Sequence, residues 1–569
     1  MESERTAVWA SAIFIAIVAA RWLPVAGIGE YGMLYDQAYR LSVGQVWYRD
    51  LLSTHPPIAA QTLGALFRLF EPSLLLYNVH LYLWWLASLL VGYLLLRRYD
   101  VQGLARSAAL VTFASLSLPC LSLGHAYFYA GSVFCGLCVL CLDIGLDGSR
   151  PSMTFGAGLL AGVTVFARQN LGIALIGGAV FLYLPLFIKK SLDLPGVVKQ
   201  LAALLSGFVL SCLTIFLIFS RAASPGEVLR ELLLDGAHGK AGQYGLLVRL
   251  IPRVNLKATL IDRRLMEIAG SIVVYLAVLW WVARRRSGSD PQPTSSSGKP
   301  LTVAIGLWVF ANFVTLIPAN VGHWMDSSTW PVIATASGAI IDLINIGWLT
   351  GMAWFLIASW NSMAAQTVAR TVLALSVFAG TILSSQSYSV HLASVLVPMT
   401  IATLGSTFPK RAIIQRLCLL TSIWAIAAIF SLPTAFTRLV PIAGPRQFVG
   451  IWTTTGYARE AEELLNHVTP VIQNRTVLWV DLYGPHAAFG GMPAASVVPW
   501  DKTTFTSRQV SYLLGRWRAN PPEYVMSGPF WGREELLGPQ SEFDQWLGHS
   551  YTENWCSALQ PELCLWKKK

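Results

Sequence analysis

Long apolar runs recur along almost the whole chain and leave it few ways to fold. Several of them approach the roughly 20 apolar residues that a helix needs to cross a bilayer. Of the 569 residues, 54% are hydrophobic and only 12% are charged. That charged fraction is about half of what soluble domains usually carry. The sequence therefore predicts a polytopic α-helical membrane protein.

The apolar runs predict about thirteen transmembrane helices, judged by the length that spans a bilayer. The predicted ranges are 7–27, 75–96, 105–123, 127–146, 153–167, 170–188, 200–220, 267–283, 302–320, 330–349, 371–388, 390–408 and 413–434. No small-residue cleavage site followed by a soluble chain comes after the first run. We therefore interpret that run as a retained helix and not as a removed signal peptide.

Short basic loops predict the orientation, because loops rich in Lys and Arg stay in the cytoplasm. Such loops fall on one side of the predicted membrane: Arg97-Arg98, Arg150, Lys189-Lys190, Arg284 to Arg286 and Lys410-Arg411. The net charge of +11 is thus interpreted as membrane anchoring, and no nucleic-acid partner is expected. Within a transmembrane domain over 1–440, the loop 28–74 then lies on the outer side and 287–299 is a flexible cytoplasmic linker. The tail 441–569 also lies outside.

The tail changes from apolar runs to alternating helix and strand patterns. Helices are predicted at "AREAEELLNHV" and "SRQVSYLLGRWRAN", and strands at "TVLWVDLYG" and "PEYVMSG". This alternation predicts a small α/β soluble domain over 441–569. Its only cysteines, Cys556 and Cys564, either form a disulfide on an oxidising outer side or remain two unrelated thiols.

Three further cysteines, Cys135, Cys138 and Cys141, repeat at a spacing that resembles a metal motif. No fourth ligand lies near them in the sequence. Free cysteines are among the most buried residues, so we interpret these three as small buried hydrophobic side chains. The sequence assigns no metal and no cofactor.

The predicted outer loop contains an unusually polar stretch, "YDQAYRLSVGQVWYRDLLSTHPP", at residues 35–57. Asp36 and Arg40 are four residues apart and share one face of a short predicted helix. Gly44 is expected to end this helix, and Pro56-Pro57 to start or reorient the next one. One interpretation is an interfacial helix with a surface Asp–Arg pair and aromatic-belt residues at Trp47 and Tyr48. The other is a functional site.

The same stretch carries a recognisable motif: an acid followed by an amide or acid, an "A…G" helix end, "YRD", and a basic residue before "PP". This motif, together with the helix-rich middle and the small α/β tail, resembles the GT-C glycosyltransferases. It is most similar to the branch that contains protein mannosyltransferases, aminoarabinose transferases and rhizobial lipopolysaccharide galacturonosyltransferases. The resemblance implies transfer of a sugar from a polyprenyl-phosphate donor to an envelope lipid, glycan or protein acceptor. It also implies a bacterial inner membrane, with the active site on the periplasmic side.

The resemblance implies that Asp36 is the essential acid of the first outer loop. A positioned carboxylate can take the proton of an acceptor hydroxyl as it attacks the anomeric carbon, and direct displacement inverts that centre. The carrier phosphate leaves with negative charge, which cations can stabilise. His55, Arg168 and Arg40 are the candidates for this role.

Two positions depart from the family pattern. Gln37 stands where relatives often have Glu, and an amide cannot act as a base, which weakens any metal site there. His55 stands where relatives often have Lys before the double proline. It either contacts the phosphate as a cation or acts as a neutral hydrogen-bond donor.

The remaining candidates each have a structural alternative. Asp50 either positions the acceptor or pairs with Arg49 or Arg40. Arg168 either binds the carrier phosphate or is an arginine that snorkels to the membrane surface. Tyr35, His125 and His323 are further substrate-binding candidates, and the histidines either line one outer cavity or merely favour the membrane interface.

Two other functions fit the same features. A transporter or flippase of lipid-linked sugars would need gates on both sides and probably inverted repeats, whereas no clear sequence repeat is found. A non-catalytic member of the family is the second alternative. The cluster of polar residues on one side and the soluble tail favour a transferase over a transporter. The departures at Gln37 and His55 keep the non-catalytic alternative open.

Overall fold

The computed structural model describes the chain in several stretches. They are residues 31–53, 55–101, 106–107, 109–110, 113–114, 126–148, 150–235, 352–353, 356–357, 360–361, 363–384, 393–404, 439–442, 444, 446–480, 486–498, 505–528 and 534–569. His125, His323 and the predicted linker 287–299 lie outside them. Six predicted spans also lie wholly or largely outside the described residues: 7–27, 105–123, 267–283, 302–320, 330–349 and 413–434. The number of thirteen helices therefore stays a prediction.

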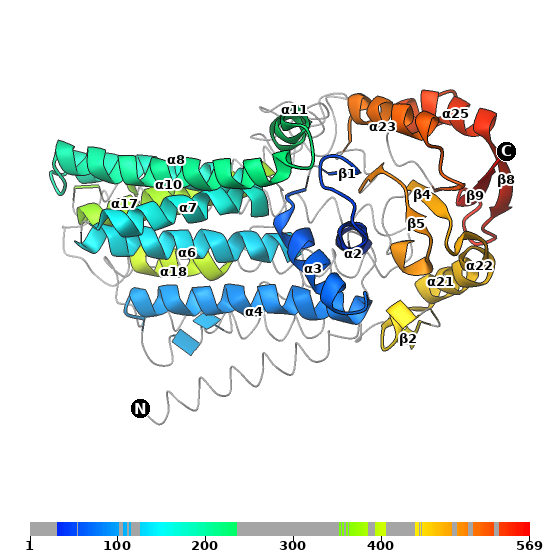
Figure 1. Cartoon of the computed structure of the whole chain (residues 1–569). Coiled ribbons are helices and arrows are strands. Elements are labelled where there is room, and N and C mark those ends of the chain that lie inside the picture. The colour runs from blue at the N-terminus through cyan, green and yellow to red at the C-terminus, as the bar shows by residue number, and fades with distance from the viewer. Residues whose placement is uncertain are drawn as a thin grey trace, which may run out of the picture.

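Long apolar helices pack side by side in one half of the molecule (Figure 1). They are α4 (Leu74–Arg98), α6 (Ala126–Gly148), α7 (Pro151–Ala167), α8 (Gln169–Phe181), α9 (Tyr183–Ile188), α10 (Leu194–Ser220), α17 (Ala365–Ser384) and α18 (Ala393–Leu404). Four stretches are long and apolar enough to cross a membrane: Leu74–Arg98, Ala126–Asp147, Gln169–Ile188 and Leu194–Ser220. Each coincides with a predicted span. The prediction of a polytopic helical membrane protein is confirmed.

Small residues let two of these helices approach closely. A Cβ atom on Gly158 of α7 would lie 2.1 Å from the carbonyl oxygen of Leu204 on α10. A Cβ atom on Gly207 of α10 would lie 2.2 Å from the carbonyl oxygen of Phe155. Glycines at such crossings are typical of helix pairs in membranes, where close backbone packing replaces the hydrophobic effect.

The far end of the helical bundle, opposite the C-terminal domain, holds a compact ion-pair cluster. Asp143 is buried on α6 and accepts from Arg98 of α4 at 2.5 Å and from Arg370 of α17 at 2.5 Å. Asp147, one turn further along α6, also pairs with Arg98. These pairs tie three helices together at the end where the predicted basic loops lie.

The C-terminal region forms a five-stranded mixed sheet with the strand order β5-β4-β7-β9-β8. The strands are β4 (Thr476–Val480), β5 (Met492–Pro493), β7 (Tyr524–Ser527), β8 (Tyr551–Cys556) and β9 (Cys564–Lys568). The helices of this region are α21 (Thr455–His467), α22 (Thr469–Ile472), η5 (His486–Phe489), α23 (Ser507–Ala519), α24 (Glu534–Leu537) and α25 (Glu542–Ser550). Before them, β2 (Leu439–Pro441) and β3 (Trp452–Thr454) form an antiparallel hairpin, and η4 (Arg446–Phe448) lies in the connection between its strands. All four segments predicted from the sequence have the expected secondary structure.

Between the bundle and this domain lie α2 (Tyr31–Ser42), β1 (Leu51–Leu52) and α3 (Ile58–Leu69) (Figure 1). As predicted, α2 ends just before Gly44, which has a φ of +93°, and Pro57 is the N-cap of α3. A short strand of the C-terminal domain, β6 (Ser496–Val497), pairs in parallel with β1. We call this end of the bundle the domain end.

A second segment of the transmembrane half also reaches the C-terminal domain. α11 (Pro225–Leu229) and the π-helical turn η2 (Arg230–Asp235) follow α10. Glu231 of η2 is fully buried and accepts from Arg508 at 2.6 Å and from Gln509 at 2.7 Å, both on α23. The domain is therefore joined to two separate segments of the transmembrane half.

Candidate functional site

Several polar and aromatic side chains of the stretch 35–57 are buried inside the protein. Asp36 is 5% exposed and Arg40 is 2% exposed, although both lie on the short helix α2. Trp47 and Tyr48 are each 1% exposed, and the Tyr48 ring packs against Phe219 at the end of α10. The aromatic-belt interpretation is therefore wrong for these two residues, because protein covers both.

Ser53 links α2 to the residues before the double proline. Its hydroxyl oxygen accepts from the Gln37 side-chain amide at 3.0 Å and from the backbone N–H of His55 at 3.1 Å. The same Gln37 amide nitrogen donates to the carbonyl oxygen of Val498 at 2.9 Å. One hydrogen of that nitrogen thus binds the outer loop and the other binds the C-terminal domain. The side-chain oxygen of Gln37 is left as the atom that could accept a hydrogen bond from a substrate.

A chain of ring contacts connects His55 to Arg168. The imidazole of His55 packs edge-on against Tyr127, with ring centroids 5.2 Å apart. Tyr127 in turn packs against Phe128 at 4.4 Å, and the Arg168 guanidinium lies 4.3 Å above the centre of the Phe128 ring. Both aromatic residues begin α6. Three predicted site residues, Gln37, His55 and Arg168, therefore belong to one continuous network of contacts.

Arg168 occupies a break between two helices. It adopts an extended conformation, with φ −161° and ψ 96°, as the residue after α7 and before α8. Gly131 makes room for it, because a Cβ atom there would lie 2.9 Å from the Cβ atom of Arg168. The side chain is 4% exposed. The snorkelling interpretation is thus wrong, since a cation that faces an aromatic ring inside the protein does not reach toward bulk water.

Arg40 is held by neutral groups. One terminal nitrogen donates to the side-chain oxygen of Gln45 at 3.2 Å and to the carbonyl oxygen of Ala494 at 2.5 Å. Its Nε atom is buried and has no hydrogen-bond partner among the described residues. Burial lowers the pKa of Arg40 to about 10, and the nearby Asp36 carboxylate partly opposes this shift. Arg40 therefore remains a cation at neutral pH, with Asp36 as a neighbouring negative charge.

Asp50 is surrounded by donors. Its carboxylate accepts from Arg49 at 2.6 Å, from Arg516 on α23 at 2.8 Å and from the backbone N–H of Val46 at 3.1 Å. Burial would raise the pKa of Asp50, but the bonds from Arg49, Arg516 and Val46 outweigh it and lower that pKa. Of the two roles predicted for Asp50, these contacts favour the organisation of the loop.

Tyr35 lies at the base of the site and faces α3. Its side chain is fully buried, and the ring packs edge-on against Phe67 at 5.2 Å. The hydroxyl has no hydrogen-bond partner among the described residues. Its predicted role in substrate binding stays a prediction, as do the roles of His125 and His323, which lie outside the described residues.

Sequence reasoning missed several residues that build this site. No local sequence pattern predicted the contacts made by Ser53, Tyr127, Phe128 and Arg516. One signal was available: Tyr127 and Phe128 lie in "GHAYFYAG", directly after the candidate His125. Aromatic residues at the start of a helix, close in sequence to a polar candidate residue, indicate that their rings can contact the side chains of the site.

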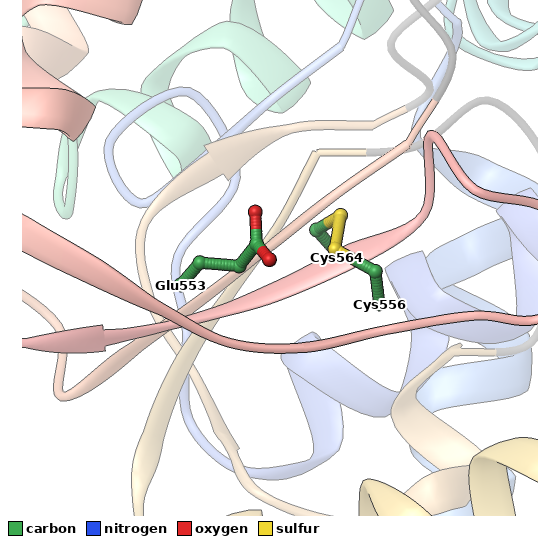
Figure 2. A group of neighbouring side chains, drawn as sticks. All are labelled: Glu553, Cys556 and Cys564. Carbon is green, nitrogen blue, oxygen red and sulfur yellow. A yellow bond between two sulfur atoms is a disulfide. The ribbon is translucent and has the colours of Figure 1, made fainter.

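The described residues contain a group of side chains whose atom types could hold a metal ion. One group has ligand atoms within 4.8 Å of one another, namely Glu553, Cys556 and Cys564 (Figure 2). Both sulfur atoms are joined to each other in a disulfide between β8 and β9, which decides between the two predicted states of these cysteines. A thiolate is the form that binds a metal, so this group is a covalent link and not a metal site.

Comparisons with known proteins give a fold-level likeness. No protein-family model matches the chain, and no curated protein matches it. ArnT from Cupriavidus metallidurans bound to undecaprenyl phosphate is similar at 13% identity and a TM-score of 0.45, covering 98% of this chain and 97% of that one. ArnT in the apo state gives 13% identity, a TM-score of 0.46 and the same coverage. At this identity the likeness concerns the fold and assigns no sugar, acceptor or catalytic residue.

Proposed function

We propose that this protein is a membrane glycosyltransferase that moves a sugar from a polyprenyl-phosphate donor to an acceptor hydroxyl. The observation that carries the proposal is the contact network that joins Gln37, His55 and Arg168. Residues from three distant segments meet at the domain end of an apolar bundle. A lipid-linked donor needs such a place, because its carrier stays in the membrane while its sugar meets a polar acceptor.

In the proposed reaction Asp36 is the general base. Its carboxylate takes the proton of the acceptor hydroxyl while that oxygen attacks the anomeric carbon. The bond between the anomeric carbon and the phosphate oxygen breaks, and the electron pair leaves with the polyprenyl phosphate. Attack opposite the leaving group inverts the anomeric centre.

Cations at the same end would stabilise the leaving phosphate. Arg168 is buried, so its charge acts at low dielectric and with little loss of side-chain freedom on binding. His55 supplies a ring whose position is fixed by Tyr127 and by the Ser53 hydroxyl at its backbone. Arg40 remains charged beside Asp36 and adds a second cation at this end.

The orientation is part of the same proposal. The domain end faces the periplasm, and the far end with its basic loops faces the cytoplasm of the bacterial inner membrane. The acceptor is an envelope lipid, a glycan or a protein hydroxyl.

The first test is Asp36→Asn, assayed with a radiolabelled polyprenyl-phosphate sugar and cell-envelope acceptors. Loss of a general base is expected to lower transfer by about 10²–10⁴-fold. Asp100→Asn is the matched control, since Asp100 is exposed on the loop that follows α4 at the far end. Full activity of Asp36→Asn would contradict the role of Asp36. A wild-type protein that moves labelled lipid across vesicles without forming a glycoside would instead support the flippase alternative.

A further inference from the structure

A short segment of the C-terminal domain, residues 493–498, lies between the domain sheet and the proposed site. We call it the strap. On one side the N–H of Ala494 donates to the carbonyl of Val477 in β4 at 2.8 Å. On the other side the N–H groups of Ser496 and Val498 donate to the carbonyls of Asp50 and Leu52 at 2.9 and 3.0 Å. The strap therefore connects the outer loop to the sheet by backbone hydrogen bonds.

Side chains from α2 and the turn after it bind the carbonyl groups of the strap. Gln45 donates to Pro493 at 2.5 Å, Arg40 to Ala494 at 2.5 Å and Gln37 to Val498 at 2.9 Å. All three donors come from the ten-residue segment 36–45, which begins with Asp36. The position of the proposed base is thus tied to the position of the strap.

Gln37 differs from the other two donors because its second partner, Ser53, lies in the residues before the double proline. Its amide donates to the Val498 carbonyl and to the Ser53 hydroxyl, and that hydroxyl also accepts from the N–H of His55. A carbonyl oxygen can only accept, so the Val498 bond requires a hydrogen on the side chain at position 37. A hydroxyl can reverse its role and donate. A carboxylate at this position would therefore lose the bond to the strap and could keep the bond to Ser53.

We propose that Gln37 is a positioning residue that couples the C-terminal domain to the site, by fixing α2 and the residues before His55 against the strap. The amide side chain, at a position where related enzymes often have an acid, is then required by the domain contact. This inference rests on the proposed function for its activity readout but not for its structural readout.

The test compares Gln37→Glu with the wild-type full-length protein. Hydrogen exchange of the Ser496 and Val498 amides reports the strap contact directly, whatever the protein catalyses. At neutral pH we expect these amides to exchange faster, by about tenfold for the loss of one buried hydrogen bond. We also expect kcat of transfer to fall by a similar factor with little change in the KM for the donor, because the base is displaced while the phosphate contacts remain.

Lowering the pH supplies a second readout. A protonated carboxyl group can donate to Val498, so the ratio of variant to wild-type activity should rise as the pH falls. The titratable and charged groups near position 37 and the strap are Asp36 and Arg40 on α2, Asp50 opposite Ser496, and His55 beyond Ser53, and the strap itself carries none. These groups are present in both the wild type and the Gln37→Glu variant. Taking the ratio of variant to wild-type activity at each pH therefore reduces the effect of their own titration on the result.

Two further variants make the outcome decisive. Gln545→Glu makes the same change at an exposed glutamine that also donates to a backbone carbonyl, and it should alter neither readout. Gln37→Ala removes the hydrogen bonds to Val498 and Ser53 without adding charge. It should raise the exchange rates of the Ser496 and Val498 amides, relative to the wild type, by the same factor at every pH. Unchanged exchange of Ser496 and Val498 in both Gln37 variants would overturn the coupling. Inactivity of the wild type would overturn the proposed function while leaving the exchange result to decide this inference.

Discussion

The two ends of the helical bundle differ in the contacts that are described for the arginines of the transmembrane half. At the far end, Arg98 and Arg370 are paired directly with the buried carboxylate of Asp143. At the domain end, Arg40 is held by an amide and a carbonyl, and Arg168 lies over an aromatic ring. Direct pairing offsets charge and fixes helices, whereas the contacts described for Arg40 and Arg168 come from an amide, a carbonyl and a ring. The difference separates a structural cluster from the place where we propose that an anionic ligand binds.

The largest expected effect comes from removing the cation at the domain end. Arg168→Gln should lower kcat of transfer by about 10²–10³-fold, the usual cost of one group that stabilises developing negative charge. The comparison requires that the variant stays folded, which thermal unfolding in detergent will show. Normal transfer by a folded Arg168→Gln protein would break the distinction between the two ends.

The same change at the far end should act on stability. Arg370→Gln removes one of the two arginines that hold Asp143 and should lower the free energy of unfolding by about 1–3 kcal/mol. Transfer by the protein that remains folded should be unchanged. The measurement is a denaturant titration beside a steady-state assay, and a specific loss of kcat here would also contradict the comparison.

The smallest effect is expected from Asp50, which behaves like a far-end carboxylate although it lies at the domain end. Its pKa in the folded protein is below the usual value of 3.8. Its contribution to stability is therefore present above about pH 4 and is lost as the pH falls through the lower, folded-state pKa. The difference in strap protection between wild type and Asp50→Asn should be visible at pH 6 and shrink below pH 4, as measured by hydrogen exchange. A difference that grows on acidification would be the wrong sign.

Local patterns predicted much of what the described residues show. The helix ended by Gly44, the start of α3 at the double proline and the four elements of the tail all follow from residues close in sequence. Turn and cap chemistry acts over a few residues, so a single sequence contains it. The family resemblance drew attention to Asp36, Gln37, His55 and Arg168, three of which meet in one network.

The contacts that assemble the site could not be predicted in this way. Gln37 meets Val498 across a separation of 461 residues, and Asp50 meets Arg516 across 466. No periodicity in either segment encodes a partner so distant. The far-end cluster had a weaker signal, because Asp143 and Asp147 are four residues apart on an apolar helix and so share one face. Two acids on one face of a helix indicate that basic residues pair with them, but the pattern does not predict which basic residues these are.

The order of strands in the C-terminal sheet has a consequence for how the protein is made. β9 follows every other strand in the sequence, yet it lies inside the sheet, between β7 and β8. A ribosome that has synthesised α2 must add more than four hundred residues before the strap and then β9 appear. Until that point the sheet is incomplete and the early helix lacks the partner that fixes it. A chain released early would therefore carry α2 without the strap and without β9.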